Sequence, residues 1–126
     1  MRILVLLLLL SISAFGQSEY AVVNLYRINA VCSSCAVAIK VNDEDVTNIQ
    51  NRDKIELKFK RSKEIVITIS GEKPKFLYQY TFQLEKGKVY YYNVKPRIPR
   101  AKGFKIVSLD DSLLEYEFTE HSFILD

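Results

Sequence analysis

Glycine, histidine and cysteine are scarce in this chain, and each shortage argues against a class of function. The 126 residues include only 4 glycines, one histidine and 2 cysteines. So few glycines leave no glycine-rich phosphate loop, and without a Gly-x-Ser-x-Gly motif or a second histidine no nucleophilic hydrolase site is indicated. A structural zinc site needs four ligands, more than the cysteines and His121 supply, and we expect His121 to be solvated or capping. We therefore expect a protein that is not an enzyme and holds no metal or other cofactor.

Strong net charge and a long apolar run are also missing. The formal charge is +3, from 18 basic and 15 acidic residues, which is too mild to predict a nucleic-acid partner. The apolar run at 3–10 is shorter than the roughly 20 residues that cross a bilayer. Preceded by Arg2 and followed by small residues at Ala14 and Gly16, it has the layout of a secretory signal peptide. We expect residues 1–16 to be removed, with export to the periplasm or the cell exterior and no transmembrane anchor in the mature chain.

Alternation of apolar and polar residues is the main signal in the remaining sequence. In "KIELKFK", for example, Ile55, Leu57 and Phe59 alternate with charged residues, which is typical of strands with one buried face. The short polar links between such segments are typical of antiparallel neighbours. Residues 17–126 therefore predict one all-β domain, an antiparallel β-sandwich of about eight short strands. Candidate strands are 20–29, 35–41, 45–49, 54–60, 64–70, 75–84, 88–95, 104–109 and 113–119.

The order of these segments resembles a family of secreted bacterial β-sandwich proteins known as domain of unknown function 2846. The resemblance is carried by Tyr26-Arg27, Val41-Asn42 and the segment "EKGKVYY" at 85–91. It implies the sandwich fold and an exported location, and it implies no activity. Many relatives look like lipoproteins, but no cysteine follows the apolar run here, so we expect no lipid attachment.

The two cysteines are spaced as Cys32-Ser-Ser-Cys35. A redox Cys-x-x-Cys places its first cysteine at a helix N-terminus, which lowers the thiol pKa, whereas "AVAIKV" after Cys35 alternates as a strand does. The ends of a four-residue turn lie within about 7 Å, close enough for a disulfide, and export favours oxidation. We expect a Cys32–Cys35 disulfide across a turn. Unpaired thiols, a redox centre and a metal site are the alternatives.

Three consecutive tyrosines, Tyr90, Tyr91 and Tyr92, fall in one expected strand. Because side chains alternate along a strand, Tyr91 should point away from the other two. Tyrosine suits half-buried strands in general. The alternative is an aromatic surface that stacks against sugar rings or a partner protein.

Basic residues gather in two segments that we expect to be mainly loops. Solvated loop charge is the ordinary interpretation. If both segments met at one end of the sandwich, they would form an anion-binding patch for an acidic protein or an anionic envelope polymer. The candidate residues are Lys58, Lys60, Arg61, Lys63, Arg97, Arg100, Lys102 and Lys105.

Together these features predict a non-enzymatic, secreted or periplasmic β-sandwich that acts as a binding or interaction module of the cell envelope. The alternative from another class is a small thiol-disulfide redox protein that uses Cys32 and Cys35. Neither the ligand nor the oligomeric state is indicated by the sequence.

Overall fold

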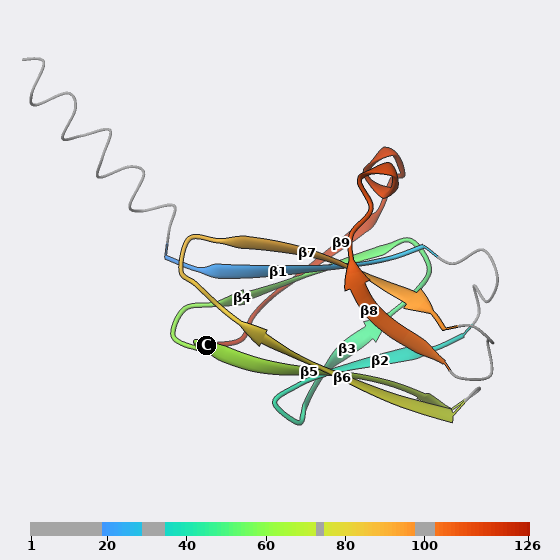
Figure 1. Cartoon of the computed structure of the whole chain (residues 1–126), viewed down its shortest axis with the longest axis horizontal. Coiled ribbons are helices and arrows are strands. Elements are labelled where there is room, and N and C mark those ends of the chain that lie inside the picture. The colour runs from blue at the N-terminus through green and yellow to red at the C-terminus, as the bar shows by residue number, and fades with distance from the viewer. Residues whose placement is uncertain (1–18, 29–34, 73–74, 98–102) are drawn as a thin grey trace, which may run out of the picture.

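The structure, a computed structural model, describes residues 19–28, 35–72, 75–97 and 103–126, which form nine strands and a short 3-10 helix (Figure 1). The expected signal peptide, residues 1–16, lies outside the described residues. The elements are β1 (Ala21–Arg27), β2 (Val37–Val41), β3 (Glu44–Ile49), β4 (Asp53–Phe59), β5 (Glu64–Glu72), β6 (Lys75–Gln83), β7 (Val89–Pro96), β8 (Phe104–Ser108), the 3-10 helix η2 (Asp111–Glu115) and β9 (Thr119–Ile124).

The strands form two sheets that pack as a sandwich, as the alternation predicts. A five-stranded sheet has the order β8-β7-β1-β4-β9, and a four-stranded sheet has the order β3-β2-β5-β6 (Figure 1). The four-stranded sheet is antiparallel throughout. In the five-stranded sheet, however, β1 pairs with β7 and β4 with β9 in parallel, so the prediction of a wholly antiparallel sandwich is wrong. Short links constrain only strands that follow one another, and these parallel partners are far apart in sequence.

The last part of the chain also differs from the expectation of a strand at 113–119. The 3-10 helix η2 occupies Asp111–Glu115, and the ninth strand begins only at Thr119. The Asp110 side chain accepts a hydrogen bond from the Ser112 backbone N–H at 3.0 Å, a local turn that competes with strand pairing. His121 consequently lies within β9 rather than after the last strand.

The alternating apolar residues face the interior as predicted. Ile55 and Leu57 of β4 and Ile67 of β5 are fully buried, and their polar neighbours point outward. Tyr92 points inward as well, with its ring centroid 4.8 Å from that of Phe82. The link between β2 and β3 is a two-residue turn in which Asn42 and Asp43 both have positive φ, the conformation that a type I′ hairpin requires.

Among the described residues, no helix is both long and apolar enough to cross a membrane.

Candidate functional site

The outward face of the five-stranded sheet, which we call the outer face, carries an ordered set of polar and aromatic side chains. The strand registers place Tyr91, Asn24, Glu56 and Ser122 side by side across β7, β1, β4 and β9. The next outward row, by the same registers, consists of Asn93, Tyr26, Lys54 and Glu120. Four strands from distant parts of the sequence therefore build one surface.

Two tyrosines and two asparagines alternate at the centre of the outer face. Asn24 lies beside Tyr91, and Tyr26 lies beside Asn93, so the two tyrosines are diagonal neighbours with ring centroids 6.5 Å apart. Their environments differ strongly. Tyr26 is 4% exposed and meets Phe118 edge-on at 4.9 Å, whereas Tyr91 is 49% exposed. Tyr91 thus presents its ring to solvent next to a packed aromatic pair.

The two asparagines keep unused hydrogen-bonding capacity. Asn24 and Asn93 are 3% and 8% exposed. The Oδ1 atom of each is buried and accepts no hydrogen bond from the residues that the structure describes. A buried acceptor without a partner costs about 1–3 kcal/mol, and native proteins contain few of them. An acceptor kept at this cost calls for a specific explanation, and a ligand that supplies the missing donor is one such explanation.

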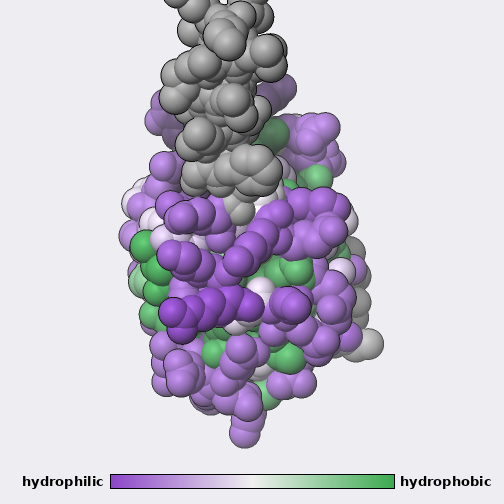
Figure 2. Space-filling view, turned by 90° about the vertical axis from the view of Figure 1, so that its left-hand side faces the viewer, coloured by the Kyte–Doolittle hydropathy of each residue, from purple (hydrophilic) through white to green (hydrophobic). Residues whose placement is uncertain are grey.

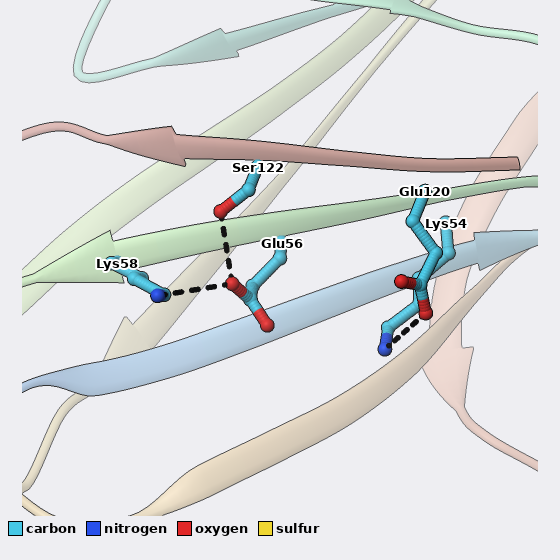
Figure 3. A network of polar contacts seen from close by, with 5 residues as sticks. All are labelled: Lys54, Glu56, Lys58, Glu120 and Ser122. Atoms are coloured by element: carbon cyan, nitrogen blue, oxygen red, sulfur yellow. Dashed lines mark hydrogen bonds and ion pairs between the residues drawn. The ribbon is translucent and has the colours of Figure 1, made fainter. Parts of the chain in front are cut away.

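Four charged residues of the outer face are joined in two ion pairs (Figure 3). Lys54 Nζ lies 3.2 Å from Glu120 Oε1, and Lys58 Nζ lies 3.4 Å from Glu56 Oε1. The Ser122 hydroxyl donates a further hydrogen bond to Glu56 Oε1 at 2.9 Å. Two cations and two anions are thus joined in pairs, and these four residues leave no net charge.

The pairing also affects proton affinity near Tyr26. Burial alone would lower the pKa of Lys54, but the hydrogen bond and charge of Glu120, with the contribution of Tyr26, raise it overall. Burial raises the pKa of the Tyr26 phenol against the opposing effect of Lys54. Both shifts favour a charged Lys54 and a neutral Tyr26 at ordinary pH.

Two adjoining depressions cross this face and share Lys54. The larger has a volume of about 620 Å³ and brings Tyr26 and Tyr91 together with Leu114 of η2. The smaller, of about 260 Å³, continues along Glu56, Glu120 and Ser122. We call the two together the outer groove. Leu114, which lines the larger depression, is 55% exposed.

Of the three consecutive tyrosines, the structure places only Tyr91 on this surface. Tyr90 and Tyr92 pack against the core from the opposite side of β7, which confirms that Tyr91 points away from them. The sequence reasoning did not single out Asn24, Asn93, Lys54, Glu56 or Glu120. Their polar positions in alternating strands indicated an outward direction, but nothing in the sequence indicated that they would meet.

The two basic segments lie at opposite ends of the sandwich. Phe59, within the first segment, is paired with Ala21, and Val22 is paired with Val89 at the start of β7. Of the second segment, Arg97 follows the far end of β7, and Lys105 of β8 is paired with Lys95 near that same end. Lys58, Lys60, Arg61 and Lys63 therefore do not form one patch with Arg97 and Lys105, while Arg100 and Lys102 lie outside the described residues.

The cysteine pair stays a prediction because Cys32 lies outside the described residues. Cys35 is half-buried against the core, two residues before β2. The strand β2 begins at Val37, shortly after Cys35, where a thioredoxin-type site would have a helix.

A second polar cluster lies inside one end of the sandwich. Arg27 is fully buried, and its Nη1 donates a hydrogen bond to the Ile49 carbonyl at 2.6 Å. Its partner across the β1–β4 pair is Asp53, and His121 Nε2 lies 3.5 Å from Asp53 Oδ1. Within the described residues, no three His, Cys, Asp or Glu side chains form a group that could hold a metal ion.

Comparison with known proteins gives no functional assignment. No family model matches the chain, so the family resemblance stays a prediction. No curated protein matches it either. Among solved structures, an NMR structure of a protein from Eubacterium rectale matches with a TM-score of 0.46 and 12% identity, covering 71% of this chain and 88% of that chain.

Proposed function

We propose that the protein is a non-enzymatic, exported binding module of the cell envelope, and that the outer groove is its ligand-binding surface. The observation that carries the proposal is the pair of buried, unpartnered Oδ1 atoms of Asn24 and Asn93 beside the exposed ring of Tyr91. An exposed aromatic ring and polar groups that need a partner are the two components of a typical small-ligand surface. The predicted signal peptide at 1–16 and the family resemblance support the envelope location.

The geometry favours binding over catalysis. Lys54 and Glu120 are engaged with each other, as are Lys58 and Glu56. Ser122, the one hydroxyl in the two rows that is not phenolic, donates to Glu56 Oε1, and Lys58 contacts the same carboxylate oxygen. The redox alternative, which depends on Cys32 and Cys35, draws no support from the extended strand that follows Cys35.

The proposal is tested by retention on envelope material with two matched variants. Tyr91→Ala removes the exposed ring from the outer groove. Leu77→Ala is the control, because Leu77 is 65% exposed but lies on β6 of the other sheet. We expect insoluble envelope fractions to retain the wild type and Leu77→Ala equally and to lose Tyr91→Ala.

Equal retention of all three proteins would exclude the outer groove as the binding surface. Absence of retention of the wild type would contradict the proposed envelope-binding function. Circular dichroism of each variant checks that the sandwich is intact before the comparison is made.

A further inference from the structure

We infer that the ligand of the outer groove is an uncharged, hydroxyl-rich saccharide chain. This inference rests on the proposed function, because it names the chemical class that the same surface takes. It follows from four properties of the described residues: the charge of the surface, its hydrogen-bonding needs, its aromatic ring and its position on a sheet face.

The charge of the surface argues against an ionic ligand. Lys54 is the one lysine among the residues that line the two depressions, and its Nζ lies 3.2 Å from Glu120 Oε1. The acidic residues Glu56 and Asp111 line them as well. A polyanion would meet no uncompensated cation among these lining residues and would be repelled by Asp111. An uncharged ligand avoids both the repulsion and the desolvation of a new charge.

The hydrogen-bonding needs of the surface fit hydroxyl groups. Asn24 Oδ1 and Asn93 Oδ1 both lack donors, and they lie in adjacent outward rows on neighbouring strands. Neither asparagine lines the two depressions, but their cross-strand neighbours Tyr91 and Tyr26 do, so the ligand reaches the buried amides only by displacing these rings. A sugar offers several hydroxyl donors at short spacing, and the same hydroxyls accept from Lys54 or donate to Glu56. The apolar C–H face of the sugar stacks on the Tyr91 ring.

The position on a sheet face, away from an edge, favours a saccharide over a peptide. A peptide in extended form usually binds by adding a strand to a sheet edge. Tyr91, Asn24 and Glu56 lie on three adjacent strands, the middle one of which is paired on both sides, so only side chains are available to a ligand there. The two depressions share Lys54 and run across the strands, which suits a chain of several sugar units.

The test is a titration of the purified, isotope-labelled protein followed by NMR. The probes are neutral hexasaccharides, one of β-1,4-linked glucose and one of β-1,4-linked N-acetylglucosamine, with an acidic oligogalacturonate and an uncharged hexapeptide as comparators. We expect at least one neutral sugar to shift the side-chain amide resonances of Asn24 and Asn93. We expect Tyr91→Ala and Asn93→Ala each to weaken that binding at least tenfold, and Leu77→Ala to leave it unchanged.

The other outcomes show whether the saccharide class alone is wrong or the proposed binding surface is wrong as well. If the peptide or the acidic sugar shifts the outer face in a Tyr91-dependent manner and the neutral sugars do not, the saccharide class is wrong and the binding surface stands. If no neutral sugar binds although envelope fractions retain the protein through Tyr91, the saccharide class is likewise wrong. If sugars bind but shift only residues elsewhere, both the ligand assignment and the proposed surface are overturned.

Discussion

The carboxylate of Asp126 accepts a hydrogen bond from the backbone N–H of Lys60 at 2.6 Å, although 65 residues separate the two in the chain. The backbone N–H groups of Arg61 and Ser62 donate to the same carboxylate at 3.1 and 2.9 Å, and the Ser62 hydroxyl donates as well. The β4–β5 turn is thus closed by one side chain from beyond β9. These contacts lie at the end of the sandwich shown in Figure 2, where the described surface is mainly hydrophilic.

Replacing this carboxylate should loosen the attachment of β9. Five of the six β9 side chains are exposed and only Phe123 is half-buried, so few apolar contacts compensate. We expect Asp126→Ala to lower the free energy of unfolding by about 1 kcal/mol, a value reduced for exposure to solvent. Urea unfolding measures this change. Glu115→Ala, which removes an exposed acid from η2, is the control and should have almost no effect.

The contribution of Asp126 should also depend on pH. Burial raises the pKa of Asp126, but the hydrogen bonds from Ser62, Arg61 and Lys60 outweigh it and lower the pKa below its ordinary value. A group with a lowered pKa in the folded state stabilises the fold above the unfolded-state pKa, near 3.9, and loses this effect as the pH falls through the folded-state value. The free energies of unfolding of the wild type and Asp126→Ala should therefore differ at pH 7 and become equal in strong acid. A constant difference down to the lowest pH would contradict this assignment.

Arg27 and Asp53 should be more important for stability than any exposed ion pair. Burial lowers the pKa of Arg27, and Asp53 opposes this effect. Arg27→Met removes the buried cation that acts on Asp53 and the hydrogen bond to the Ile49 carbonyl, and we expect it to cost about 3–5 kcal/mol in urea unfolding. Arg27→Met combined with Asp53→Asn removes the leftover charge, and we expect it to recover part of that loss. If the losses of unfolding free energy in the two single variants instead add up in the double variant, that additivity would show that Arg27 and Asp53 are not coupled.

Replacing a buried amide of the outer face should maintain or raise stability but weaken ligand binding. If Asn24 Oδ1 lacks a partner in the free protein, replacing Asn24 by the similarly sized Leu should leave the protein as stable or stabilise it by about 1 kcal/mol. The same variant should bind the ligand of the outer groove less well. Asn48→Leu, at an exposed position of β3, controls for a general effect of added apolar surface. Marked destabilisation by Asn24→Leu alone would mean that the amide is satisfied in the free protein.

The cysteine motif should be a minor structural feature. Closing so small a ring stabilises a fold by only about 2 kcal/mol, so replacing Cys32 and Cys35 together by serine should keep cooperative unfolding with a loss no larger than that. Mass spectrometry of the exported protein should detect the disulfide. An insulin-reduction activity that disappears in the double variant would instead support the redox alternative.

The short-range pattern of the sequence determined which segments are strands and which side chains face inward. Ile55, Leu57 and the tyrosines of β7 follow this pattern, because alternation depends only on the strand's own geometry and on one face being buried. At Asp110 and Ser112 a local turn competes with strand pairing. The pattern there predicted a strand, and the structure has the 3-10 helix η2. Signal-peptide and cysteine expectations also come from local sequence, but they concern residues at 1–16 and Cys32, which are outside the described part.

Only the tertiary structure decided which strands are neighbours, and with that the candidate site. Every strand offers the same backbone donors and acceptors, so pairing is chosen by long-range packing that no local pattern encodes. The parallel β1–β7 pair places Asn24 beside Tyr91, and the parallel β4–β9 pair brings Glu120 to Lys54. The burial of Arg27 has the same origin, because an inward position becomes fully enclosed only when the second sheet covers it.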